Sequence, residues 1–188
     1  MTSDKRIVIG LVGRKGSGKG TVARLLKERY GASVYRFSDL LRETLDRLYV
    51  EKNRENLVAL SEILRHQFGE GVLKQAMVRR VGDDPSRLIV IDGIRRLDDL
   101  NGLEELGTFY LINIAAPVEL RHERVAQRGE NAGETTRTFD AFKEMEMLPT
   151  EVTIGDVEPK ARKTIENLGS YDELAAKVDE LMSEIKNT

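Results

Sequence analysis

A glycine-rich segment near the start of the chain constrains the fold more than any other feature of the sequence. Residues 13–21 read GRKGSGKGT, so Gly13, Gly18 and Lys19 match the pattern G-x-x-x-x-G-K. A β-branched run, IVIGLV, precedes the segment and an amphipathic helical pattern follows it, which is the context that the pattern requires. Glycines let backbone N–H groups turn toward an anion, and the positive end of the following helix adds to the attraction. The segment therefore predicts a phosphate-binding loop between a strand and a helix.

The hydroxyl that commonly follows the lysine of such a loop is displaced by one residue. Gly20 follows Lys19, and Thr21 comes next. Both Thr21 and Ser17 offer an oxygen near Mg²⁺ or the phosphates, and the spacing does not choose between them. We expect the loop residues to bind the phosphates of ATP; they are Gly13, Gly16, Ser17, Gly18, Lys19, Gly20 and Thr21.

Apolar runs and helical patterns alternate along the rest of the chain. Further strands are expected at SVYRF, SRLIVIDG, TFYLINIAA and RKTIENL. Helices are expected across residues 38–81, 97–107, 117–129 and 138–147, and a final helix over 170–186 has a capping box, Ser170 with Glu173. This alternation predicts an α/β fold with a parallel sheet covered by helices on both faces.

Composition excludes several classes of partner and chemistry. The chain has 188 residues, with 30 Lys and Arg against 32 Asp and Glu, so no overall positive field attracts nucleic acid or a membrane surface. There are no cysteines, which excludes disulfides and cysteine-ligated zinc. The first residues show neither a signal peptide nor a membrane span, so we expect a cytoplasmic protein. His66 and His122 lack the spacing of a metal site.

The acidic strand end narrows the type of phosphate-loop protein. A GTPase would carry an N-K-x-D motif, which is not found in the sequence. An ATPase commonly has a glutamate after the acidic residue of this strand to activate water, but here Asp92 is followed by Gly93. An enzyme that transfers phosphate to an acceptor must keep water out, so this pattern favours a kinase.

Arginines follow the strands where this fold places its substrates. Phosphoryl transfer needs cations on both sides of the moving group, and ligands of open α/β sheets bind beyond the carboxyl ends of the strands. Arg121, Arg124 and Arg128 share one face of a helix, although a solvated stripe paired with Glu119 and Glu123 is the alternative. The other candidates are Arg42, Arg95, Arg96 and Arg137.

Four segments, taken together, resemble the adenylate-kinase-like nucleoside monophosphate kinases. GSGKGT at 16–21 resembles the phosphate loop of that family, with its Gly between Lys and Thr. FSDLLR at 37–42 resembles the acceptor motif T-G-D-x-L-R, and VIDGIRR at 90–96 is similar to L-D-G-F-P-R. APVELRHERVAQR at 116–128 is similar to the segment that enters the lid. The four segments occur in the family's order and are distributed over most of residues 7–137.

The resemblance implies a P-loop NTPase fold, a three-layer α/β/α sandwich with a five-stranded parallel sheet and a short lid at 129–137. It implies that Lys19 holds the transferring phosphates, that Asp92 orders Mg²⁺ through water, and that Arg124 lies beside the donor base. Thr21 is the other candidate metal residue, with Ser17 as its alternative. It further implies a catalytic role for Arg95, Arg128 and Arg137, with the last two closing on the phosphates. The residues that it assigns to the acceptor are Asp39, Arg42 and Arg95.

Residues 53–80 depart from adenylate kinase. They look more like phage-type deoxynucleotide kinases and the dephospho-coenzyme A kinase-like group, which makes Arg65 a candidate acceptor residue, with a plain helix-surface position as the alternative. TIENLGSYDEL resembles the ending of that group, which implies that residues 167–170 lie near the donor base. The lid is short, and the four-cysteine zinc version is impossible here.

We therefore expect a single P-loop kinase domain over residues 1–188, with residues 38–81 as its acceptor-binding region. Its expected activity is ATP- and Mg²⁺-dependent transfer of the γ-phosphoryl to a nucleoside monophosphate or a similar small phosphorylated acceptor. Two alternatives remain: phosphorylation of a hydroxyl, as in dephospho-coenzyme A kinase, with Asp39 as the base, and a nucleotide-binding regulatory protein without transfer activity. No nucleic acid or membrane partner is expected, and the oligomeric state is open.

Overall fold

A five-stranded parallel sheet organises the chain in the computed structural model, which describes residues 6–128 and 138–187. The strand order is β2-β3-β1-β4-β5, and every neighbouring pair is parallel. The strands are β1 (Ile7–Val12), β2 (Ser33–Arg36), β3 (Leu88–Asp92), β4 (Thr108–Ala115) and β5 (Lys163–Glu166). All five lie at predicted strand positions, which confirms the expected three-layer α/β/α fold.

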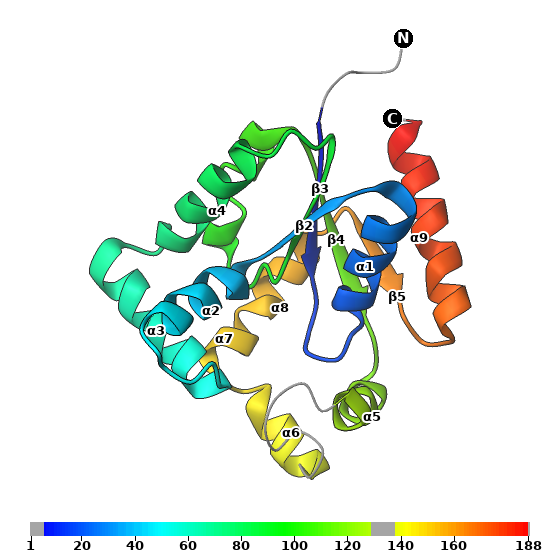
Figure 1. The fold of residues 1–188 in the computed structure, drawn as a ribbon. Coiled ribbons are helices and arrows are strands. Elements are labelled where there is room, and N and C mark those ends of the chain that lie inside the picture. The colour runs from blue at the N-terminus through cyan, green and yellow to red at the C-terminus, as the bar shows by residue number, and fades with distance from the viewer. Residues whose placement is uncertain (1–5, 129–137, 188) are drawn as a thin grey trace.

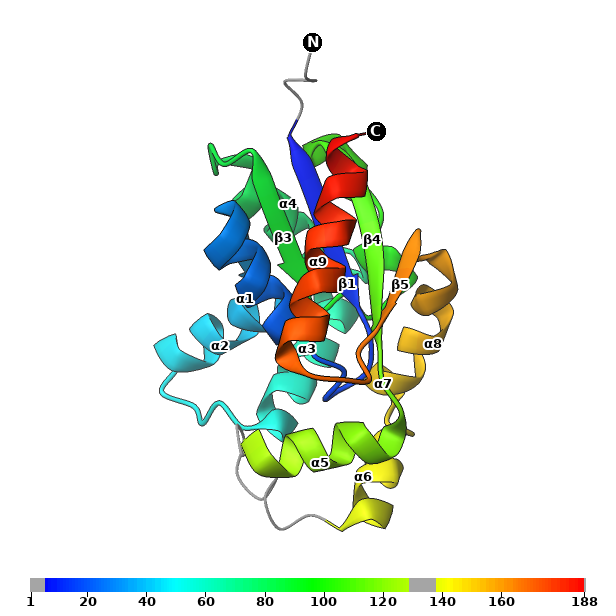
Figure 2. The same cartoon turned by 90° about the vertical axis from the view of Figure 1, so that its right-hand side faces the viewer.

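Helices cover both faces of this sheet (Figures 1 and 2). One face is covered by α1 (Lys19–Tyr30) and α9 (Tyr171–Lys186), and α5 (Val118–Arg128) and α6 (Phe139–Met145) lie beyond the carboxyl edge of the strands. The helical elements on the other side are α2 (Phe37–Arg47), α3 (Arg54–Phe68), α4 (Val72–Gly82), α7 (Pro149–Val152), α8 (Ile154–Val157) and the short 3-10 helices η1 (Leu97–Asp99), η2 (Leu103–Leu106) and η3 (Glu158–Lys160).

Two apolar clusters, one on each face, hold these layers together. The apolar face of α9 is buried against α1 and the sheet, in a cluster that includes Ile9, Leu25, Leu174, Val178 and Leu181. The opposite cluster joins β1 and β3 to α2, α4 and α8. Because the central strands β1, β3 and β4 are buried on both faces, they read in the sequence as continuous apolar runs rather than as alternating patterns.

Local signals place several ends of these elements. Gly31 ends α1 in a left-handed conformation (φ 69°), and the predicted capping box of α9 is present: Ser170 Oγ accepts from the amide of Glu173 at 3.3 Å. In the turn before β3, hydrogen bonds from Ser86 and Tyr35 hold the pKa of Asp84 well below its usual range. The caps and the contact between Ser86 and Asp84 depend on neighbouring residues, so they can be read from the sequence, whereas Tyr35 is 49 residues away from Asp84.

The helix predicted over residues 97–107 is wrong. Two 3-10 helices, η1 and η2, occupy this region, and Gly102 interrupts them with a positive φ of 82°. The carboxylate of Asp99 accepts hydrogen bonds from the amides of Arg95 (3.2 Å) and Arg96 (3.1 Å). Because Asp99 is buried in this tertiary role, the segment folds around its carboxylate rather than as one regular helix.

Candidate nucleotide and acceptor site

The phosphate loop connects β1 to α1 and takes a conformation that demands glycine. Gly13 has φ 141°, and a Cβ there would lie 2.3 Å from the carbonyl oxygen of Ile114. Gly18 has φ 106°, and a Cβ there would lie 2.2 Å from Asn167 Nδ2. Both positions combine an unfavourable backbone region for other residues with a close approach of neighbouring atoms. The sequence pattern thus has a steric origin in this fold.

Lys19 begins α1 and folds back over the loop. Its Nζ donates to the carbonyl oxygens of Gly13 (2.6 Å) and Arg14 (3.2 Å). Ser17 Oγ is buried and has no hydrogen-bond partner among the described residues. A buried hydroxyl without a partner is uncommon, so this oxygen is available to a ligand of the loop.

Two distant side chains brace the loop from outside. Asn167, which follows β5, donates from Nδ2 to the carbonyl oxygen of Ser17 at 2.8 Å, and Arg124 donates to the Asn167 carbonyl oxygen at 3.0 Å. On the other side, Arg121 donates to the carbonyl oxygen of Lys15 at 3.3 Å and forms an ion pair with Glu146. Arg121 is therefore a buried support of the loop, not part of a solvated cationic stripe.

A cavity of about 510 Å³ opens in front of the loop, at the carboxyl ends of β1, β2 and β3. This is the edge of the sheet where ligands of such folds bind. Among the described residues, its wall includes eight cationic side chains and two acidic ones, Asp92 and Asp99. The cationic residues are Lys15, Lys19, Arg36, Arg42, Arg65, Arg95, Arg96 and Arg124. The cavity is thus strongly positive in a chain whose net charge is −2.

Asp92 ends β3 beside the loop, where the sheet register pairs it with Leu11 of β1 and Arg36 of β2. Its Oδ2 lies 3.6 Å from Arg36 Nε, and its Oδ1 is buried and receives no hydrogen bond from a described residue. An anionic oxygen in this state suits a cation. Thr21 lines the same cavity, so the oxygens of Asp92 and Thr21 would suit a Mg²⁺ ion.

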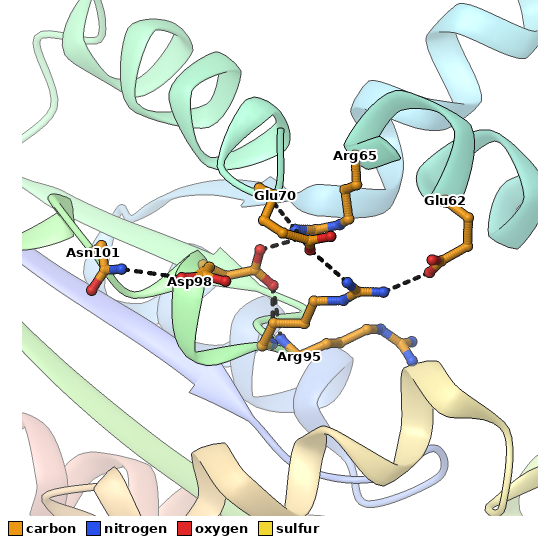
Figure 3. Close-up of polar contacts among 8 residues, drawn as sticks. Glu62, Arg65, Glu70, Arg95, Asp98 and Asn101 are labelled. Atoms are coloured by element: carbon orange, nitrogen blue, oxygen red, sulfur yellow. Dashed lines mark hydrogen bonds and ion pairs between the residues drawn. The ribbon is translucent and has the colours of Figure 1, made fainter. Parts of the chain in front are cut away.

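A buried ion pair supports the loop that follows β3 (Figure 3). Arg65 of α3 donates from Nη2 to Asp99 Oδ1 at 2.8 Å, and their side chains are only 5% and 2% exposed. Arg96 forms ion pairs with Glu62 at 2.5 Å and with Glu70 at 2.7 Å. Arg65 therefore does not lie on the helix surface; it faces the cavity, and its Nε is buried without a partner in the described structure.

Arg95 extends away from this network toward α7 (Figure 3), where it forms an ion pair with the buried carboxylate of Glu151. Arg42 differs from the other arginines of the cavity, because it makes no hydrogen bond or ion pair with any described residue. Asp39 lies one turn earlier on α2 and is not part of the cavity wall. Burial raises the pKa of Asp39, against the opposing effect of Arg36, Arg42 and Arg80.

Most of the residues predicted for the site converge on one cavity, although their roles stay predictions. Those in its wall are Gly16, Gly18, Lys19, Gly20, Thr21, Arg42, Arg65, Asp92, Arg95 and Arg124. Gly13 and Ser17 belong to the loop behind it. Arg137 and the predicted lid at 129–137 lie outside the described residues, as does the side chain of Arg128.

The residues of the site that the sequence analysis missed include Lys15, Arg36, Asp99 and Glu151. Arg36 directly precedes the recognised segment FSDLLR at a predicted strand end, so its position could have indicated a role. Asp99 was assigned to a helix, and nothing near Glu151 in the sequence indicates that it contacts Arg95. In the described segments, no helix has the length and apolarity needed to cross a membrane.

Comparisons with known proteins agree with this architecture. A UPF0200 protein of Hyperthermus butylicus is 28% identical over 185 residues, which cover 98% of each chain. Shikimate kinase from Aquifex aeolicus has a TM-score of 0.57 at 18% identity and covers 96% of this chain and 97% of that chain. Shikimate kinase from Bacteroides thetaiotaomicron has a TM-score of 0.64 at 12% identity, with 94% and 98% covered. At such identities the likeness shows a P-loop kinase-like fold.

The sequence profile of a family described as "AAA domain" matches residues 12–146, from the end of β1 to the residue after α6. The narrower resemblance to nucleoside monophosphate kinases stays a prediction. Because the profile covers most of the chain, including the phosphate loop, Asp92 and the cationic cavity, the chain belongs to the AAA-domain family.

Proposed function

We propose that this protein is an ATP- and Mg²⁺-dependent phosphotransferase that moves the γ-phosphoryl group of ATP to a phosphate of a nucleoside monophosphate or a similar small acceptor. The observation that carries the proposal is the excess of cations in the cavity, eight against two acids, directly in front of the phosphate loop. Two polyanions must lie end to end for this reaction, and only concentrated positive charge makes that arrangement favourable.

The donor half of the site would be the phosphate loop. Its amides and the start of α1 would bind the β- and γ-phosphates, and Lys19 would move from the carbonyl oxygens of the loop to the phosphate oxygens. Mg²⁺, held by Thr21 and Asp92, would neutralise phosphate charge in this position. Arg124, held by Asn167 at the outer side of the loop, would lie beside the nucleoside.

The acceptor half would lie between α2, α3 and the loop after β3. Arg42 is the first candidate for the acceptor phosphate, because it forms no ion pair or hydrogen bond with a described residue. Arg95 would exchange its ion pair with Glu151 for one with the acceptor phosphate. The buried ion pair of Arg65 and Asp99 would hold the loop after β3 in place. A phosphate acceptor is largely ionised at neutral pH, so its oxygen needs cations and alignment rather than a general base.

Phosphorylation of a hydroxyl is the second candidate, and Asp39 is the observation in its favour. A carboxylate whose pKa is raised by burial suits a general base, and the fold is shared with shikimate kinases. However, Asp39 lies outside the cavity wall, so a hydroxyl acceptor would require a change in its side-chain position. We therefore favour the phosphate acceptor.

The test is an assay of ADP release with Mg²⁺-ATP and a panel of acceptors that contains nucleoside monophosphates and dephospho-coenzyme A. We expect acceptor-stimulated ADP release with a nucleoside monophosphate, and phosphorus NMR of the product should show a new phosphoanhydride. A new phosphomonoester would support the hydroxyl reading instead. ADP release that no acceptor stimulates would refute both.

Two variants locate the activity in the proposed site. Lys19→Ala should lower turnover at least about 100-fold, because it removes a cation from the transferring group. Arg42→Ala should raise the KM for the acceptor about tenfold or more, since a charge-assisted hydrogen bond to phosphate contributes roughly 1.5–3 kcal/mol, and should leave the KM for ATP nearly unchanged. Arg47→Ala is the matched control, because Arg47 is an exposed residue of the same helix outside the cavity wall.

A further inference from the structure

We propose that Arg36 is an additional phosphate-binding residue of the transfer site: its guanidinium binds the γ-phosphoryl group of ATP, and Asp92 holds it in position while no nucleotide is bound. This inference rests on the proposed function and names a residue that neither the sequence motifs nor the family resemblance assigns. Four observations support it, from the sheet register, the ion pair, the phosphate loop and the cavity.

The sheet itself fixes the position of Arg36. Arg36 is the last residue of β2 and stands in register with Asp92, the last residue of β3. Residues in register on neighbouring parallel strands project to the same side of the sheet. β1, which leads into the phosphate loop, pairs with β3 on the other side. Regular strands rather than a loop therefore hold Arg36 one strand away from Asp92 and two strands away from the phosphate loop.

The contact between Arg36 and Asp92 leaves both groups incompletely satisfied. Arg36 Nε lies 3.6 Å from Asp92 Oδ2, within reach of an ion pair but too long for a good hydrogen bond. Asp92 Oδ1 is buried without a donor among the described residues, and the Arg36 side chain is 43% exposed in the cavity. A guanidinium has five N–H donors in a planar fork, so Asp92 orients Arg36 but leaves most of its donors for a ligand.

The guanidinium lies against the residue that separates Lys19 from Thr21. Arg36 Nη2 is 3.8 Å from the point that a Cβ of Gly20 would occupy. Gly20 is in the first turn of α1, where the amides and the helix dipole attract phosphate. The absence of a side chain at Gly20 leaves this surface open, so a phosphate held by the first turn comes within reach of Arg36.

This geometry suits charge that develops during transfer. An oxygen of the acceptor phosphate forms a bond to the γ-phosphorus as the bond from the γ-phosphorus to the β–γ bridging oxygen breaks, and that electron pair leaves with ADP. Negative charge is spread over the equatorial oxygens of the moving group, and a planar fork binds two such oxygens at once. Asp92 is also the predicted metal ligand, and a bound Mg²⁺ would neutralise its carboxylate, so Arg36 would then be available to the phosphate.

The experiment compares the affinity of each variant for Mg²⁺-ADP with that for a non-hydrolysable Mg²⁺-ATP analogue, by calorimetric titration without an acceptor. Arg36→Gln keeps much of the packing and removes the charge. We expect unchanged ADP affinity and a loss of about tenfold or more in analogue affinity, because one charge-assisted hydrogen bond is removed. Arg36→Lys should recover part of the loss, and Arg47→Gln should behave as the unmodified protein. Circular dichroism establishes that each variant is folded.

The outcomes separate this inference from the proposed function. If Arg36→Gln lowers the two affinities equally, or lowers neither, Arg36 does not bind the γ-phosphoryl group and the inference is overturned. If Arg36→Gln fails to fold, Arg36→Lys is compared with the unmodified protein instead. The inference is overturned if the two proteins have the same ratio of analogue affinity to ADP affinity. If the unmodified protein transfers phosphate to no acceptor, the proposed function fails, while the titration still tests Arg36.

Discussion

Removing the charge of Asp99 should destabilise the protein far more than removing that of its neighbour Asp98. Asp99→Asn leaves Arg65 as a buried cation without its main counter-ion, at a site where the two side chains are 5% and 2% exposed. Breaking a buried ion pair by removing one partner costs about 3–5 kcal/mol. The Asp99 carboxylate also accepts two backbone hydrogen bonds, which an amide group supports less well.

A second carboxylate moderates this loss. Glu70 Oε2 lies 3.7 Å from Arg65 Nη1, although the Glu70 side chain is 54% exposed and its attraction is therefore screened. We therefore expect Asp99→Asn to lower the free energy of unfolding by about 3 kcal/mol, at the lower end of that range. For a chain of this size each kcal/mol corresponds to about 2–4 °C, so the melting temperature should fall by about 6–12 °C.

Urea denaturation and calorimetry measure the effect, and Asp98→Asn is the matched control. Asp98 is exposed and accepts a 3.5 Å hydrogen bond from Asn101, so its replacement should change stability by about 0.5 kcal/mol or less. The double variant Arg65→Met with Asp99→Asn should be less destabilised than the sum of the two single variants. A loss below about 1 kcal/mol for Asp99→Asn would refute the reasoning from burial.

Two further predictions concern the phosphate loop and the acid stability. Gly18→Ala should abolish tight nucleotide binding in a calorimetric titration, because its Cβ would displace Asn167. Gly31→Ala is the control, since Gly31 also has a positive φ but no atom lies within 4 Å of its Cβ position. This variant should bind nucleotide normally and lose only about 1–2 kcal/mol of stability. Asp84 has a lowered pKa in the folded protein. Its contribution to stability is therefore present above its unfolded pKa of about 4 and is lost as the pH falls further. Asp84→Asn should reduce stability at neutral pH, with a difference from the unmodified protein that shrinks on acidification; a difference independent of pH in urea titrations would contradict this.

The sequence by itself determined the phosphate loop, the fold class and the strand positions. Each of these follows from residues close together in the chain: Gly13, Gly18 and Lys19 have the spacing that one loop conformation requires, and buried parallel strands appear as short β-branched runs. The predicted convergence of Arg42, Arg95 and Asp92 at one edge of the sheet also follows, because carboxyl ends of parallel strands meet at one edge.

Only the tertiary structure decided which charged side chains meet. Arg95 and Glu151 are 56 residues apart, and Asn167 reaches Ser17 across 150 residues, with no local pattern to indicate either contact. The same is true of Arg36, whose importance comes from the register of β2 against β3 and from the space above Gly20. A side chain's charge is local information, but its counter-ion is set by the packing of elements that are distant in sequence. That packing determines which cations of the cavity remain for a ligand.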